Sequence, residues 1–146
     1  MKKTLISSSL IVLMTLMVYG TQIWDYIKPN KTLNKEITLS IAPESNYTSA
    51  AYSNAKATVH VVVTKVRGNK ETIVWDKVFD TIQLKNYPRL NQAYTEDVKI
   101  PGLIDNKEKL MVNYIITYDN NGSVLKLSSG ENMTTGLAKE KMRIGI

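Results

Sequence analysis

The chain has 146 residues, the size of one domain, and its 43% hydrophobic and 22% charged residues exclude a disordered tail. Its net charge is +6, but basic residues are not concentrated among aromatic ones, so we expect no nucleic-acid partner. The chain has no cysteine. This absence excludes disulfide scaffolds, thiol nucleophiles, zinc–thiolate sites and attachment of a lipid to a cysteine.

The first 20 residues have the three parts of a secretory signal peptide. Lys2 and Lys3 provide a positive start, residues 5–18 carry no charge, and Gly20 ends the segment with a small residue. The uncharged stretch continues to Trp24, so residues 4–24 are also long enough to span a bilayer as a retained signal anchor. Both interpretations predict a hydrophobic N-terminal helix and an exported chain. It would be periplasmic, secreted or on the cell surface, and anchored to the inner membrane by residues 4–24 if the segment is not cleaved.

Residues 21–35 are polar and basic and contain Pro29 and Asn30, so we expect a linker there. Over residues 36–146 hydrophobic residues recur with a period of two, which is typical of strands. Residues 142–146 are expected to be an edge strand or a tail. The other predicted strands are 37–41, 57–64, 72–79, a short one at 81–84, 94–100, 110–118 and one that starts at 124–127.

Two turns connect predicted hairpins. Residues 67–70 form a polar turn with one glycine, and residues 119–122, Asp-Asn-Asn-Gly, have the chemistry of a type I′ turn. About seven short strands, separated by turns and without a long amphipathic helix, are typical of an immunoglobulin-like β-sandwich. We therefore predict an all-β fold over residues 36–146, although a small open barrel would give a similar pattern.

Few residues suggest catalysis or metal binding. His60 is the one histidine, and a zinc site or a catalytic triad needs partners that the sequence does not supply. Asp76, Asp80, Glu96 and Asp97 are explained by solvated strand faces, because nothing in the sequence brings two of them together for acid–base work. The oxygen-rich turns lack the spacing of a calcium-binding loop. We predict no catalytic residue, no metal, no cofactor and no enzymatic activity.

Aromatic residues are the best candidates for contact with a partner. Loops at the ends of a β-sandwich are the usual place for recognition, and two predicted loops contain tyrosines. Trp75, Phe79, Tyr87 and Tyr94 could line a groove, although aromatics at strand spacing belong more often to the core. The predicted partner-binding residues are Tyr47, Tyr52, Tyr87, Arg89 and Tyr94.

The span 57–127 resembles small β-sandwich proteins of the bacterial envelope. The resemblance rests on strand order and hydrophobic rhythm in ATVHVVVTKV, NKETIVWDKVF, NKEKLMVNYIITYD and NNGSVLKL. One similar group is the pilotin and YbaY-like lipoprotein family, and another is the curli-assembly accessory proteins. This chain lacks the lipidated cysteine of the first group and the Cys-x-Cys pair that some members of the second carry. The resemblance implies a non-enzymatic binding or chaperoning role in the cell envelope.

These observations lead to one main hypothesis about function. We expect an exported, non-enzymatic binding or assembly module of the bacterial cell envelope that acts through protein–protein contacts. Its partner would be another envelope or secreted protein, bound by adding an extended segment to an exposed sheet edge or through the end loops. The alternatives are a membrane-anchored structural subunit of an envelope complex and, third, an envelope enzyme or enzyme inhibitor.

Overall fold

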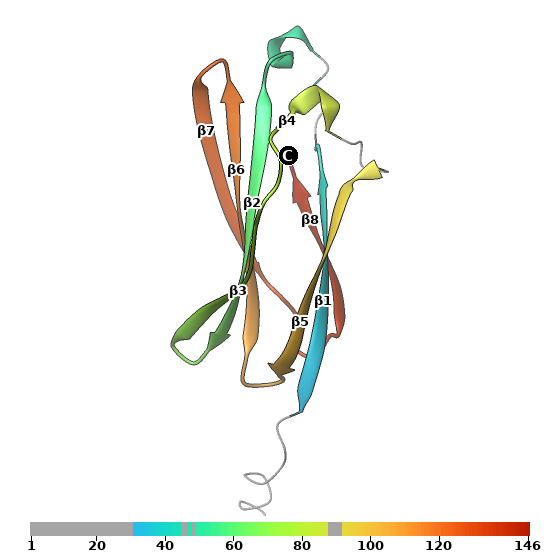
Figure 1. The fold of residues 1–146 in the computed structure, drawn as a ribbon, viewed down its shortest axis with the longest axis vertical. Helices are drawn as coiled ribbons and strands as arrows, with labels where there is room; N and C mark the ends of the chain where they lie inside the picture. Colours follow the sequence, from blue (N-terminus) through green and yellow to red (C-terminus); the bar gives the residue numbers. More distant parts are fainter. Residues whose placement is uncertain (1–30, 45–46, 48, 88–91) are drawn as a thin grey trace, which may run out of the picture. The chain divides into compact units, whose positions relative to one another are not determined.

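The computed structural model describes residues 31–44, 47, 49–87 and 92–146. The predicted N-terminal helix and the predicted contact residue Arg89 lie outside these residues. The regular elements are β1 (Thr32–Ala42), η1 (Ala50–Tyr52), β2 (Lys56–Arg67), β3 (Lys70–Val78), β4 (Ile82–Gln83), η2 (Leu84–Asn86), β5 (Tyr94–Ile104), β6 (Lys109–Asn120), β7 (Ser123–Asn132) and β8 (Lys139–Gly145), where η marks a 3₁₀ helix (Figure 1). The prediction of an all-β domain is confirmed.

The strands form two sheets that face each other (Figure 1). The smaller sheet has the order β5-β1-β8, and the larger has the order β3-β2-β6-β7, with β4 paired to the first two residues of β2. The two hairpins predicted from turn chemistry are present as β2–β3 and β6–β7. Four long strands therefore lie at sheet edges, β3 and β7 in the larger sheet and β5 and β8 in the smaller, and the two-residue β4 pairs with β2 alone.

Alternating residues of the central strands fill the space between the sheets. Every second residue of β2, at Ala57, Val59, Val61 and Val63, is fully buried, as are Ile37 and Leu39 of β1. Successive side chains of a strand point to opposite faces, so the period of two seen in the sequence places one face of each strand in this core. The β-branched residues that dominate β2 suit such a half-buried pleated surface.

The first and last strands of the domain pair with each other. β8 runs parallel to β1 in an unbroken register from Glu36 opposite Lys139 to Ala42 opposite Gly145. The pairing continues beyond the strand ends, because the N–H of Ile146 donates to the carbonyl of Ala42 at 3.0 Å. The C-terminal segment is thus an edge strand, one of its two expected forms.

The start of β1 differs from the expected linker. β1 begins at Thr32, and Lys35, at the end of the expected linker, is only 2% exposed. Its Nζ donates to Oε2 of Glu140 at 2.5 Å and to the carbonyl of Thr134 at 2.7 Å. A buried ammonium needs such partners, and they lie about a hundred residues away in the sequence. The polar composition of residues 21–35 therefore predicted a linker where the first strand, β1, already begins.

Candidate functional site

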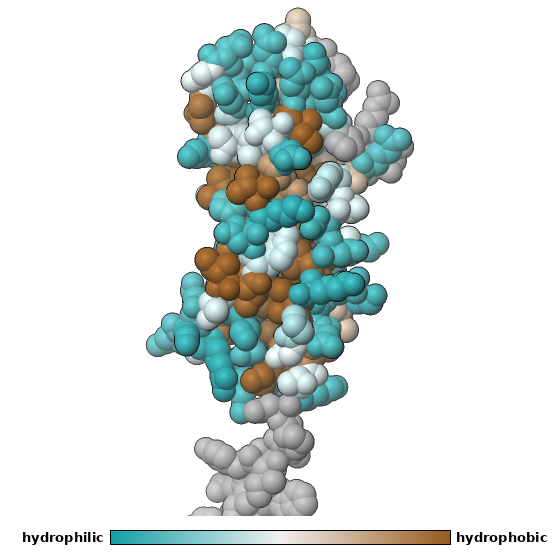
Figure 2. Space-filling view, viewed as in Figure 1, coloured by the Kyte–Doolittle hydropathy of each residue, from teal (hydrophilic) through white to brown (hydrophobic). Residues whose placement is uncertain are grey.

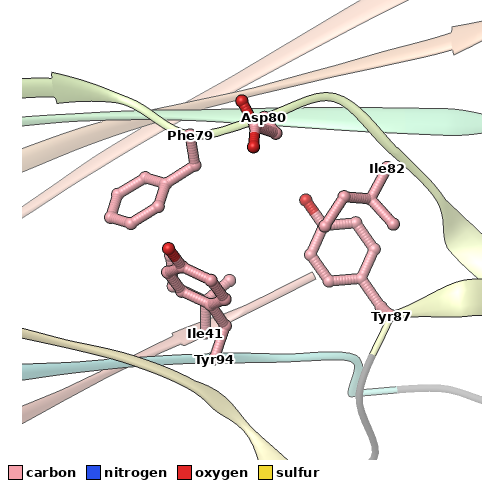
Figure 3. Close-up of a pocket in the computed structure, with 6 residues that line it drawn as sticks. All are labelled: Ile41, Phe79, Asp80, Ile82, Tyr87 and Tyr94. Carbon is pink, nitrogen blue, oxygen red and sulfur yellow. The ribbon is translucent and has the colours of Figure 1, made fainter.

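An aromatic pocket lies where the chain passes from β3 to β4. The chain leaves the edge of β2 after Phe79, whose N–H donates to the carbonyl of Val59, and joins it again at β4. A cavity of about 40 Å³ lies beside this connection between β3 and β4. It is lined by Ile41, Phe79, Asp80, Ile82, Tyr87 and Tyr94 (Figure 3).

The sheet register explains why a β5 side chain reaches this pocket. Tyr94 opens β5 directly opposite Ile41 of β1, so both side chains point toward the larger sheet. Because β5 is an edge strand, Tyr94 remains 41% exposed. Its ring meets that of Phe79 almost at a right angle, 84°, with the ring centroids 5.4 Å apart.

Tyr87 forms the buried wall of the same pocket. It follows η2, and its hydroxyl donates to the carbonyl of Ala57 at 3.2 Å. Burial, with a smaller contribution from Tyr118, raises the pKa of Tyr87 to about 12. This hydroxyl therefore stays protonated at physiological pH and holds the segment after η2 against β2.

A charged cluster borders the pocket. Nζ of Lys77 lies 2.9 Å from Oε2 of Glu96 and 5.1 Å from the centroid of the Phe79 ring. The hydrogen bond to Glu96 is the main reason why the pKa of Lys77 is raised, and Asp80 adds to this effect. The cluster thus joins the β3 edge of one sheet to the β5 edge of the other.

The predicted contact residues therefore divide into two groups. Tyr87 and Tyr94 meet in the pocket, together with Phe79, which the sequence had suggested as a possible groove residue. Tyr47 and Tyr52 instead contact each other edge to face, with ring centroids 5.2 Å apart. Trp75 packs against the core and is not among the residues lining this pocket.

The β7 strand forms a second candidate surface, which the sequence did not indicate. All ten of its residues are exposed. Leu125 and Leu127 pair with Tyr118 and Ile116 of β6, and Ile116 is buried in the core. The two leucines therefore lie on the sheet face that points toward the smaller sheet, yet they are 57% and 49% exposed. The smaller sheet does not cover this part of β7, and hydrophobic side chains reach the surface on the side of the domain where β7 runs (Figure 2).

The other three long edge strands carry features that discourage pairing with a further strand. β3 has a register shift opposite Val63, β5 has another and contains Pro101, and β8 carries three basic residues among seven. Bulges, prolines and charges are the devices by which proteins protect sheet edges. β7 pairs with β6 in an unbroken register, has no proline, and carries one lysine and one glutamate.

The hairpin turn determines which backbone groups of β7 are free to bind a partner. Asn121 and Gly122 have φ values of 52° and 89°, as a type I′ turn requires, so Asn120 and Ser123 form the hydrogen-bonded pair that closes it. In an antiparallel ladder, hydrogen-bonded residues alternate with residues whose N–H and C=O point the other way. The groups that point away from β6 are those of Val124, Lys126, Ser128, Gly130 and Asn132.

His60 pairs with one acidic residue, and the other acidic residues lie elsewhere. Nε2 of His60 lies 2.6 Å from Oδ1 of Asp76 on an exposed face of the larger sheet. Asp80 lines the pocket and Glu96 pairs with Lys77. Among the residues that the structure describes, no three potential metal ligands cluster, and no helix is long and apolar enough to cross a membrane.

The comparisons with known proteins give no match. No family model, curated protein or solved structure matches this chain. The fold defines the chain as an all-β protein of two facing sheets. Its function is therefore inferred from the residues described above.

Proposed function

We propose that this chain is an exported, non-enzymatic binding module of the bacterial cell envelope, with an immunoglobulin-like sandwich that binds an extended segment of another protein along β7. The observation that carries the proposal is the unprotected β7 edge, ten residues long and exposed on both faces. The charged start, uncharged stretch and small residue of the first 20 residues support export.

Strand addition suits the chemistry of this edge. A partner strand beside β7 would hydrogen-bond to the outward backbone groups of Val124, Lys126, Ser128, Gly130 and Asn132, which supply affinity without sequence preference. Specificity would come from alternate side chains, because every second residue of the partner would lie next to Leu125 and Leu127. We therefore expect a partner segment with apolar residues at alternate positions.

Photo-crosslinking in the native host tests this proposal. A benzophenone amino acid at Lys126 on β7 is expected to give an adduct with a second envelope protein, whereas the same group at Thr95 on β5 gives none. Ser128→Pro removes one outward N–H of β7 without removing a bond to β6, so the adduct should fall about tenfold or more. Ser128→Ala keeps the N–H and should keep the adduct.

Two results would contradict the proposal. Equal adduct yields from the proline and alanine variants would show that the β7 backbone is not used. An adduct with the mass of two copies of this chain would show that the β7 edge binds a second copy and not another protein. Intact mass and fractionation of the same sample test export, since a cleaved soluble chain or a membrane-bound full chain is expected outside the cytoplasm.

A further inference from the structure

The aromatic pocket is a second candidate binding site, and its argument does not depend on the β7 edge. Three aromatic rings from separate parts of the chain form its walls: Phe79 after β3, Tyr87 after η2, and Tyr94 at the start of β5. Figure 3 shows Phe79 and Tyr94 on one side of the cavity, Tyr87 on the other, and the carboxylate of Asp80 between them at the rim. Ile41 and Ile82 complete the lining.

The electrostatics of this arrangement favour a cation. The face of an aromatic ring is the negative end of its quadrupole, and an ammonium group within about 6 Å of a ring centroid is attracted to it. The protein already uses this attraction, because Nζ of Lys77 lies 5.1 Å from the centroid of Phe79. Lys77 is paired with Glu96, whereas Asp80 has no salt bridge to any residue that the structure describes. Among the residues that the structure describes, the charges of Lys77, Glu96 and Asp80 sum to −1.

The size of the cavity limits the ligand. A cavity of about 40 Å³ has room for about three water molecules, and pockets for drug-sized ligands are about ten times larger. It therefore fits a group of three to five heavy atoms, such as a small ammonium group or the tip of one side chain.

The ring and aliphatic carbon that makes up most of the lining favours one of two kinds of ammonium. A primary ammonium, as in lysine, brings three N–H donors that must be satisfied when it is buried. Here the acceptors among the lining residues are the carboxylate of Asp80 and the hydroxyls of Tyr94 and Tyr87, the last of which also donates to the carbonyl of Ala57; the rest of the lining is ring and aliphatic carbon. A methylated ammonium has no such requirement and gains from the ring faces alone.

We propose that this pocket binds a quaternary ammonium group of the trimethylammonium class, with the rings of Phe79, Tyr87 and Tyr94 as walls and Asp80 as the counter-charge. Such a group occurs in free choline and in choline-bearing lipid headgroups, and both would present the same chemistry to these rings. Lys77 stays with Glu96 and is not displaced by the ligand.

Titration of the full chain with choline, followed by NMR of the ring protons and by calorimetry, tests the proposal. We expect upfield shifts of the choline methyl signal and a Kd of about 1 mM, in line with a ligand this small. The neutral isostere 3,3-dimethylbutan-1-ol has the same shape without the charge and should bind at least about tenfold more weakly. Butylammonium should also bind more weakly than choline.

Matched variants locate the site. Tyr94→Leu should weaken choline binding about 2- to 30-fold, and Asp80→Asn about 2- to 5-fold. Tyr52→Leu removes a tyrosine of nearly the same exposure, 40% against 41%, and Asp76→Asn removes a carboxylate of β3 that pairs with His60. Neither control should change the Kd, and circular dichroism checks that all four variants fold.

Three results would contradict binding of a quaternary ammonium group in this pocket. Equal binding of choline and its neutral isostere, or no choline-induced shift at about 50 mM, would overturn the proposal. So would equal effects of the pocket variants and their controls. Flotation with phosphatidylcholine vesicles, against phosphatidylglycerol vesicles as control, distinguishes the two sources: selective flotation supports a lipid headgroup, and choline binding without flotation supports a soluble ligand.

Discussion

Replacing Lys35 by methionine removes the charge of a buried ion pair while keeping most of the side chain's length. Lys35 is 2% exposed, and its ammonium is bound by Oε2 of Glu140 and the carbonyl of Thr134. The pair joins the start of β1 to the start of β8, which are neighbours in the smaller sheet. Lys35→Met therefore tests how much this internal pair contributes to the free energy of unfolding.

The magnitude follows from what Glu140 retains. Removing one partner of a buried pair typically costs about 3–5 kcal/mol, because the other charge is left without compensation. Here the side chain of Glu140 is 18% exposed, and Thr134 still donates to it from its N–H and its hydroxyl. We expect Lys35→Met to lower the free energy of unfolding by about 2–3 kcal/mol and the midpoint temperature by about 10 °C.

The same two strands supply the control. Lys139 of β8 pairs with Glu36 of β1 at 3.2 Å, but its side chain is 78% exposed. Lys139→Met should therefore cost about 0.5 kcal/mol or less. Urea unfolding followed by tryptophan fluorescence measures both variants. If Lys35→Met cost no more than Lys139→Met, the reasoning about burial would be refuted.

A double-mutant cycle separates the pair from its surroundings. Glu140→Gln alone leaves the buried ammonium of Lys35 facing a neutral amide and should cost more than Lys35→Met. Combined, the two substitutions should cost less than the sum of the single ones by about 1–3 kcal/mol. Additive costs would show that the two side chains contribute separately.

Three further predictions concern other parts of the domain. Partial burial acts to raise the pKa of Glu140, but bonds from Lys35 and Thr134 outweigh it, and the N–H of Ile104 lowers the pKa of Glu108. The folded chain therefore binds fewer protons than the unfolded chain in this pH range. The contribution of these two carboxylates to the free energy of unfolding should be fully present above the ordinary pKa of about 4.5 and be lost as the pH falls through their lower pKa values in the folded state. Urea unfolding midpoints between pH 7 and pH 3 would show this decrease. Tyr87→Phe leaves the Ala57 carbonyl without its side-chain donor and should cost about 1 kcal/mol in the same assay. Gly122→Ala places a side chain at a φ of 89° and should cost about 1 kcal/mol, without altering the spectrum of the folded state.

The strands were predictable because their signal is local. The alternation in β2 and the Asn-Gly turn before β7 each depend on a few neighbouring residues, and both predictions agree with the structure. Within the smaller sheet, the parallel pairing of β1 with β8 was not predictable, because it joins residues about a hundred positions apart. Lys35 illustrates the consequence: its sequence neighbours are polar, and only the distant Glu140 explains its burial.

The aromatic pocket and the β7 edge also differ in how far the sequence predicts them. Tyr87 and Tyr94 could be named from the sequence as aromatic residues near loops, but their meeting with Phe79 depends on the crossing from β3 to β4. The β7 edge had no sequence signal beyond its hairpin, because Leu125 and Leu127 alternate as core residues do. They are exposed because the smaller sheet leaves this part of β7 uncovered. A local sequence pattern does not predict this.

The parallel pairing of β1 and β8 also determines how the domain would respond to mechanical force. Thr32 and Ile146 lie at opposite ends of this pair, so a pull between them slides the two strands along each other (Figure 1). All hydrogen bonds of the seven-pair register would then bear the load together, whereas a hairpin pulled at its open end unzips one bond at a time. A force applied between residues 32 and 146 would therefore load the β1–β8 pair in shear and not by unzipping.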